Sequence, residues 1–168
     1  MKTALYSLSI FFGLGICALG FGSPDFSGNW IGDVTRTGSM SVIKHGVNGQ
    51  MEIATKKLVV MLVQQRGEGL EIESVWSDNS ATKVSYILDG NEHSSVDETG
   101  NPMIYQAKLN GDQLLIQATR NIKTPFGNTE IPTKEEWVLS ADQNTLTITT
   151  TTTTQFGSNA QKKIYTRQ

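Results

Sequence analysis

The stretch Phe26-Ser27-Gly28-Asn29-Trp30 decides the fold that this sequence predicts. It follows a hydrophobic leader and precedes a chain that shows one β-hairpin pattern after another. Gly28 allows the backbone to bend sharply, and Trp30 offers a large ring that can fill one end of a rolled sheet. A guanidinium can stack on such a ring, and the candidates are Arg167, near the end of the chain, and Arg120. The stretch therefore predicts a small antiparallel barrel in which Trp30 plugs one end.

Residues 1–22 have the order of a secretory signal peptide. Lys2 precedes an apolar run from Ala4 to Leu19, and small residues follow at Gly20 and Gly22. The run of about 16 residues is short of the roughly 20 that a membrane-spanning helix needs. We expect cleavage after Gly20 or after Gly22, which leaves residues 23–168 as a single secreted or periplasmic domain.

The one cysteine of the chain, Cys17, lies within this leader. Bacterial lipid attachment calls for a small residue before the cysteine, and Ile16 stands there, so we expect no lipoprotein anchor. Once the leader is removed, no disulfide and no zinc-thiolate site can form. The domain must then be held together by burial, for which about 146 residues are enough.

The balance of charge argues against a nucleic-acid partner. The chain carries 14 basic and 16 acidic residues, a net charge of -2, and shows no run of Lys or Arg. A protein that tracks phosphates needs a basic stripe, so we expect no nucleic-acid partner. After removal of the leader, we expect no membrane partner either.

Hairpin patterns begin at Leu58. The segment Leu58–Val63 is β-branched and apolar on both faces, and Leu70–Glu73 then alternates apolar with charged residues. Asp89-Gly90 and Asn110-Gly111 are pairs that favour tight turns between strands. Alternating runs continue on both sides of Asn110-Gly111, which predicts a hairpin there.

Two polar segments are expected to lie outside the main strands. Gly32–Gln50 is Gly-rich and predicts a long loop with a short strand over Met40–Ile43, and Asn91–Pro102 predicts a turn-rich connection. No segment of ten or more residues after the leader repeats with a helical period. We therefore predict an all-β, antiparallel up-and-down barrel of about eight to nine strands, which removes exposed edges by closing on itself.

Several motifs carry a resemblance to a known family. Gly28-Asn29-Trp30 resembles the Gly-x-Trp signature of the lipocalins, and Arg167 is similar in placement to the basic residue that packs over that Trp. Together with Leu88-Asp89-Gly90, Glu136-Trp137 and Lys163-Ile164-Tyr165, the pattern resembles small secreted bacterial lipocalin-like proteins. The resemblance implies a barrel that encloses a ligand. The chain departs from a typical lipocalin because it shows no helix beside the barrel and no disulfide.

The candidate binding residues are large apolar or aromatic side chains on strand faces. Flat rings bind apolar ligands, and tyrosine hydroxyls orient them. The same side chains could instead fill the interior, since small barrels are either packed solid or hold one ligand. The predicted lining consists of Trp76, Tyr86, Met103, Tyr105, Ile116 and Leu146.

The sequence offers no support for catalysis. It contains no nucleophile elbow, phosphate loop or dinucleotide fingerprint. Its two histidines are His45 and His93, and His93 with Asp97 could offer at most two ligands to a metal. We expect no metal and no cofactor.

Two functions follow from these patterns. The first is an exported protein that binds a small apolar or amphipathic ligand, whose identity the sequence does not give. The alternative is a structural or protein-interaction module of the cell envelope, in which the two-sided strand Leu58–Val63 forms a homodimer. The run Thr149–Thr154 is either a hydroxyl-lined mouth of the barrel or simply a segment with strong strand propensity.

Overall fold

Strands make up nearly all of the described chain. A computed structural model describes residues 23–32, 40–45, 51–124 and 127–168. The predicted signal peptide, residues 1–22 with Cys17, lies outside the described residues. The strands are β1 (Gly28–Gly32), β2 (Met40–His45), β3 (Met51–Lys56), β4 (Leu58–Arg66), β5 (Gly69–Trp76), β6 (Ala81–Ile87), β7 (Asp89–Val96), β8 (Pro102–Asn110), β9 (Gln113–Thr124), β10 (Gly127–Leu139), β11 (Thr145–Thr154) and β12 (Gly157–Arg167).

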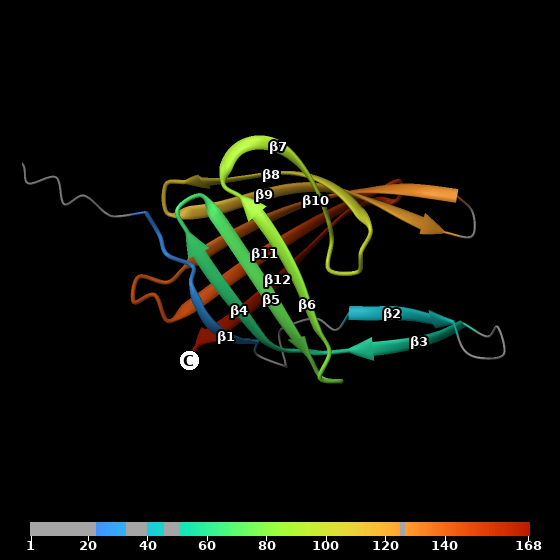
Figure 1. Cartoon of the computed structure of the whole chain (residues 1–168), viewed down its shortest axis with the longest axis horizontal. Helices are drawn as coiled ribbons and strands as arrows, with labels where there is room; N and C mark the ends of the chain where they lie inside the picture. The colour runs from blue at the N-terminus through green and yellow to red at the C-terminus, as the bar shows by residue number, and fades with distance from the viewer. Residues whose placement is uncertain (1–22, 33–39, 46–50, 125–126) are drawn as a thin grey trace, which may run out of the picture.

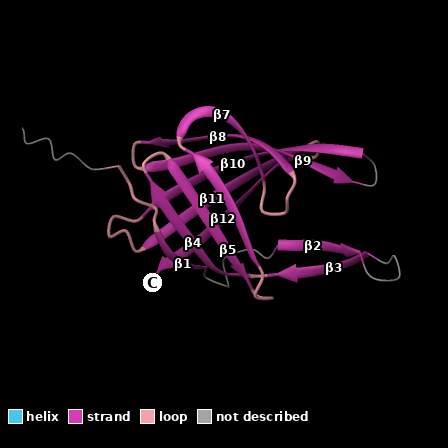
Figure 2. Ribbon diagram, viewed as in Figure 1, coloured by secondary structure: helices cyan, strands magenta, loops and turns pink. Residues whose placement is uncertain are grey.

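Ten of these strands form one antiparallel sheet. Its order is β6-β5-β4-β1-β12-β11-β10-β9-β8-β7, and β2 pairs with β3 in a separate hairpin. The short strand β1 joins the two halves, because Trp30 lies opposite Met61 of β4 on one side and Arg167 of β12 on the other. In Figure 1, β4, β5 and β6 cross in front of the longer strands β8 to β12, so the sheet rolls over on itself. Figure 2 shows the β2–β3 hairpin extending away from this body.

The barrel is nearly closed, with a seam between β6 and β7, the two edges of the sheet. No backbone strand pairing joins β6 to β7, but side chains bridge this seam. The backbone N–H of Ile87 donates a hydrogen bond to the Tyr105 hydroxyl at 3.0 Å. The ring of Tyr105 packs edge-on against Tyr86, with centroids 4.9 Å apart. Two tyrosines thus hold the edges together without a continuous strand ladder.

The predicted architecture is right in class and differs in detail. The sheet has ten strands where the sequence predicted eight or nine. Residues predicted as a turn-rich connection, Asn91–Pro102, contain most of β7. The short strand predicted over Met40–Ile43 is present as β2, which extends to His45. The sequence does not predict β7 because its inward positions include the polar residues His93 and Ser95, which break the apolar alternation. Pairing with β8 makes this segment a strand.

The two predicted tight turns have different outcomes. Asn110-Gly111 joins β8 to β9, with Asn110 opposite Gln113 and Gly111 at a φ of 65°. Asp89-Gly90 instead begins β7, and Gly90 has a φ of 77°. Since β6 and β7 are not hydrogen-bonded neighbours, this pair bends the chain across the seam and does not close a hairpin.

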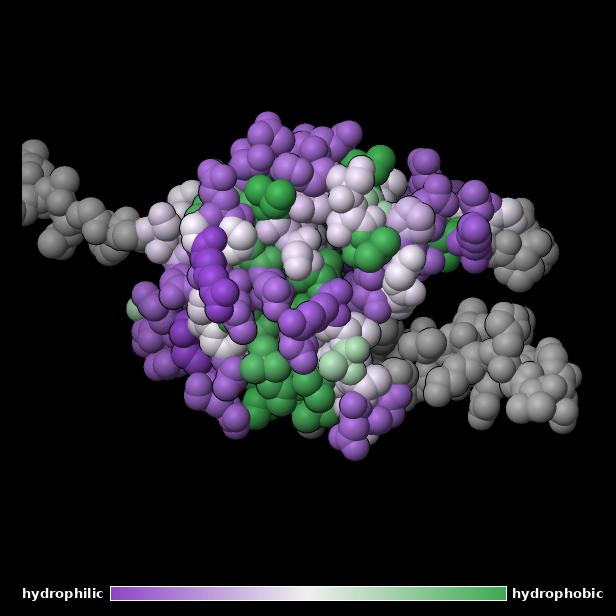
Figure 3. All heavy atoms as spheres, in the orientation of Figure 1, coloured by the Kyte–Doolittle hydropathy of each residue, from purple (hydrophilic) through white to green (hydrophobic). Residues whose placement is uncertain are grey.

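Strand β4 has apolar residues on both faces, as the sequence indicates. Met61 and Val63 are buried in the core, whereas Val60 and Leu62 point outward and are half-buried. Figure 3 shows hydrophobic surface gathered over the lower ends of β4 and β5. Self-association through Leu58–Val63 stays a prediction. Within the described residues, no helix has the length and apolar character required to span a membrane.

One end of the barrel is filled by aromatic side chains. Trp30 and Phe26 are fully buried, and the Trp30 indole N–H donates to the Phe26 carbonyl at 3.0 Å. The ring of Phe26 packs edge-on against Trp137 at 6.1 Å. The guanidinium of Arg167 lies 4.6 Å from the Trp30 ring centroid and donates to the Ser27 carbonyl at 2.8 Å.

Gly28 makes room for this arrangement. Its φ is +148°, and a Cβ added there would lie 3.4 Å from Nη1 of Arg167 and 3.6 Å from Nε1 of Trp30. At Gly157, φ is +120° and an added Cβ would meet nothing within 4 Å. The two positions therefore share an unusual backbone and differ in crowding.

We predict that Gly28→Ala lowers the free energy of unfolding by about 2–3 kcal/mol, because an alanine is strained at this φ and any backbone shift that relieves the strain disturbs the adjoining Arg167 and Trp30 side chains. Gly157→Ala, which adds strain alone, should cost about 1 kcal/mol. Urea denaturation of both variants measures the difference. Equal losses would show that the space around Gly28 is not needed for the Trp30 and Arg167 contact.

Candidate functional site

An interior cavity of about 110 Å³ is the candidate site. Inward side chains of β4, β5, β6, β9, β10, β11 and β12 line it, so it lies within the rolled sheet. Its apolar part includes Met61, Ile72, Trp137 and Ile148, all of them buried. Trp30 is not part of the lining, but Trp137 is, and it packs against Phe26, so the aromatic plug adjoins the cavity.

The rest of the cavity wall is polar and charged. Arg120, Glu135 and Lys163 line it from β9, β10 and β12, and Glu98 reaches it from the loop between β7 and β8. Tyr165, from β12, lines it as well. An apolar pocket with a few convergent polar groups is the usual form of a small-molecule site.

The loop between β7 and β8 is attached to the barrel through Arg120. The Arg120 guanidinium lies 3.7 Å from the Asp97 carboxylate and 4.0 Å from that of Glu98. It also donates to the Thr133 hydroxyl at 3.1 Å. Because Arg120 lines the cavity and holds Glu98 beside it, this loop forms one wall of the site.

Asp97 organises the loop itself. Its carboxylate accepts hydrogen bonds from the backbone N–H groups of Thr99 and Asn101, both at 2.9 Å, and from the Thr99 hydroxyl at 2.7 Å. Burial by itself would raise the pKa of Asp97, but the hydrogen bonds from Thr99 and Asn101 outweigh it and hold that pKa below its ordinary value. The loop is therefore fixed by a charged carboxylate.

A second carboxylate, Glu135, lies among aromatic groups. Its Oε2 accepts a hydrogen bond from the Trp137 indole N–H at 3.0 Å. Burial, and then the negative charge of Glu135, raise the pKa of Tyr86. The same two causes raise the pKa of Tyr165, so both hydroxyls stay protonated at neutral pH.

The six side chains predicted to line a cavity are all buried, but they do not share one site. Trp76 lines the interior cavity, and its indole N–H donates to the Thr82 hydroxyl at 3.0 Å. Tyr86, Met103, Tyr105, Ile116 and Leu146 lie in the core outside this lining. Tyr86 and Tyr105 close the barrel seam instead.

The threonine run of β11 faces two ways. Thr150 lines the interior cavity, while Thr151 and Thr153 line an outer groove of about 430 Å³. This groove lies across β8 to β11 and is open and lined mainly by amides, hydroxyls and exposed apolar groups. The threonines of β11 thus lie on both faces of the sheet, and Thr150 adds a hydroxyl to the cavity wall.

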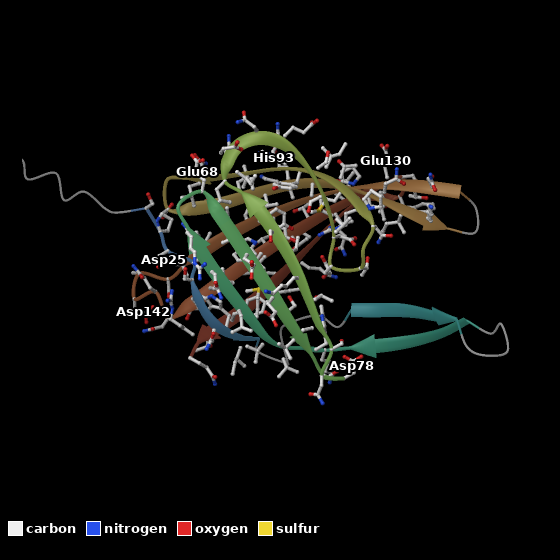
Figure 4. The ribbon with its side chains drawn as sticks, viewed as in Figure 1. Asp25, Glu68, Asp78, His93, Glu130 and Asp142 are labelled. Carbon is white, nitrogen blue, oxygen red and sulfur yellow. The ribbon has the colours of Figure 1, made fainter. Side chains whose placement is uncertain are left out.

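His93 lies away from the interior cavity. Figure 4 places it on β7, where the strand arches over the barrel. Its Nε2 is 2.9 Å from Asp89 Oδ1, and its ring packs against Tyr105 at 5.5 Å. Hydrogen bonds from Asn91 and then His93 lower the pKa of Asp89 to about 2. In the described part of the chain, no three His, Cys, Asp or Glu side chains gather as a metal site would require.

The charged lining residues were not among the candidates taken from the sequence. A signal for them exists, since Arg120 continues the inward phase of Ile116 and Ala118, and Glu135 lies two residues before the inward Trp137. Alternation alone does not indicate that charged side chains occupy inward positions. Only their convergence with Lys163 and Glu98 defines a site.

Comparisons with solved structures support the class of fold. A zebrafish ileal bile acid-binding protein complexed with cholic acid aligns with a TM-score of 0.52 and 12% identity, over 85% of this chain and 98% of that one. A REP1-NXSQ fatty acid transporter aligns at 0.52 and 13%, over 84% and 95%. A fatty-acid-binding protein of Echinococcus granulosus aligns at 0.51 and 13%, over 84% and 96%.

These similarities show the fold alone, an antiparallel β-barrel like that of the bile-acid- and fatty-acid-binding proteins. No protein-family model matches the chain. No curated protein matches it in sequence. The class of protein is therefore defined by the ten-stranded, nearly closed barrel.

We predict that acid weakens the loop between β7 and β8. The Asp97 pKa is depressed below its ordinary 3.8, so its stabilising contribution is complete above that value and is lost as pH falls through the folded-state pKa. Asp97→Asn should cost about 1–3 kcal/mol at pH 7 and show a shallower loss of stability below pH ~4. Urea denaturation across pH measures this.

Asp112→Asn, at the exposed β8–β9 turn, is the matched control and should follow the unsubstituted protein. Superimposable pH profiles of the Asp97→Asn variant and the unsubstituted protein would show that Asp97 does not hold the loop.

Proposed function

We propose that this protein binds a small apolar or amphipathic ligand inside its barrel. The observation that carries the proposal is the 110 Å³ cavity, whose apolar part adjoins convergent polar groups. The fold is shared with proteins described as binding fatty acids and cholic acid, which is consistent with such a role. An apolar tail would lie against Trp137 and Ile148, and a polar head would meet the charged wall.

The size of the cavity limits what enters it as it stands. Ligand pockets are commonly about 300–1,000 Å³, and a cavity of about 150 Å³ holds benzene. A space of 110 Å³ is smaller than that, but it is partly open, so a short alkyl chain can enter with only part of its length inside. A longer ligand requires movement, and the seam between β6 and β7 can widen without breaking a strand ladder.

We further propose that the protein is exported. The support is the charged, apolar and small-residue order of residues 1–22. Small secreted bacterial lipocalin-like proteins, which the sequence resembles, fit the same proposal.

Filling the cavity should abolish binding. Titration of the purified protein with hexan-1-ol, followed by calorimetry or NMR shifts, should give saturable binding. Ile148→Trp places a larger side chain in the cavity and should weaken binding at least about tenfold, since a filled pocket excludes the alkyl chain. Ile104→Trp is the control, because Ile104 is exposed on the outer face of β8.

Thermal unfolding of both variants verifies that they fold. An unsubstituted protein that does not bind hexan-1-ol, or an Ile148→Trp variant that binds it unchanged, would contradict the proposal of an interior ligand.

Cleavage of the signal peptide tests the proposal that the protein is exported. A bacterial host that expresses the whole chain should release a protein whose intact mass corresponds to a first residue of Phe21 or Ser23, after cleavage at Gly20 or Gly22. Recovery of only the full-length chain from the cell interior would rule out export.

A further inference from the structure

We propose that the interior cavity selects ligands whose polar head donates hydrogen bonds, an alkylammonium above all, and discriminates against carboxylates. The recognising group is the carboxylate of Glu135. This inference deepens the proposed function and rests on it, because it names the class of head group that the same cavity accepts.

Glu135 is an acceptor that faces the cavity and is only partly used. It lies on β10 between Ile116 of β9 and Thr150 of β11, and it is half-buried. Its only hydrogen bond among the described residues comes from Trp137, to Oε2, and it has no ion pair there. An ionised carboxylate offers about four lone-pair positions, so Glu135 retains acceptor capacity toward the cavity.

Tyr165 adds a second polar group to the same wall of the cavity. It is 2% exposed and lines the cavity, yet its hydroxyl has no hydrogen-bond partner in the described part of the chain. Among the described residues, every fully buried polar side-chain atom has a hydrogen-bond partner. Since the Tyr165 hydroxyl has none, it must be part of the small exposed surface of this residue. That hydroxyl can accept a second hydrogen bond from a ligand that Glu135 holds.

The cations around the cavity do not reverse this preference. Arg120 is held by Asp97, Glu98 and Thr133. Lys163 has no ion-pair partner among the described residues, but it is a single positive charge. Counting Asp97 with Arg120, the site has three carboxylates and two cations, and therefore one uncompensated negative charge.

A bound head group changes that balance. An ammonium would bring the site to neutrality, whereas a carboxylate would place four negative charges against two positive ones. At such a site, which is only partly exposed to solvent, like charges repel and opposite charges gain from a charge-assisted hydrogen bond. An alcohol, which is neutral and can donate one hydrogen bond, should fall between the two.

The test uses three ligands with one tail: hexylamine, hexan-1-ol and hexanoate, at pH 7.5 and constant ionic strength. Calorimetry or NMR titration of the unsubstituted protein should give hexylamine at least tenfold tighter than hexanoate, with hexan-1-ol between them. Glu135→Gln should weaken hexylamine binding about tenfold and change hexan-1-ol binding by no more than about twofold.

Glu136→Gln is the matched control. Glu136 is the next residue of β10, points to the opposite face and pairs with Lys134 at 2.7 Å, so its loss should leave all three affinities unchanged. Hexanoate binding as tightly as hexylamine, or a preference that survives Glu135→Gln, would overturn the inference while leaving an interior ligand site in place. Failure of all three ligands to bind would instead refute the interior site itself, and the head-group preference with it.

Discussion

The junction at β1 is the constraint on which the rest of the structure depends. This five-residue strand, the first of the sheet in chain order, is hydrogen-bonded to β4 on one side and to the last strand, β12, on the other. Trp30 lies at its centre, fully buried, under the guanidinium of Arg167. Arg167 also donates to carbonyls of Ser27 and Gln143, which ties the chain before β1 and the β10–β11 turn to the end of β12. Figure 4 shows Asp25 and Asp142 near each other at this end of the barrel.

The interior of the barrel has an apolar part around Trp30 and a polar part at the cavity. Around Trp30 and Phe26 the packing is aromatic and fully buried, and the Trp30 indole N–H finds a carbonyl partner. In the cavity, inward positions carry Arg120, Glu135 and Lys163. Burying charges is costly unless they are paired or hydrated, so these positions cannot lie inside the dry core. Their presence on inward faces marks the part of the interior that is open to a ligand or to water.

The seam between β6 and β7 is the other consequence of this architecture. A rolled sheet that does not complete its ladder leaves two edges, and exposed edges favour aggregation unless something covers them. Here Tyr105 spans the gap by accepting a hydrogen bond from Ile87 and packing against Tyr86. Side chains that the sequence indicated as ligand-lining are thus used to close the barrel.

The sequence by itself determined the class of fold, since alternation with period two, turn pairs such as Asn110-Gly111 and the absence of helical periodicity depend only on local chemistry. It also pointed to Trp30 and, through the resemblance to the lipocalin signature, to Arg167 at the other end of the chain, with Arg120 as the alternative. Tertiary structure alone decided that β7 is a strand, because its polar residues gain that conformation by pairing with β8. It alone decided the site as well, since the convergence of Glu98, Arg120, Glu135 and Lys163 depends on strand register and tilt across four separate segments. Alternation tells which residues share a face, but closure of the sheet determines which faces meet.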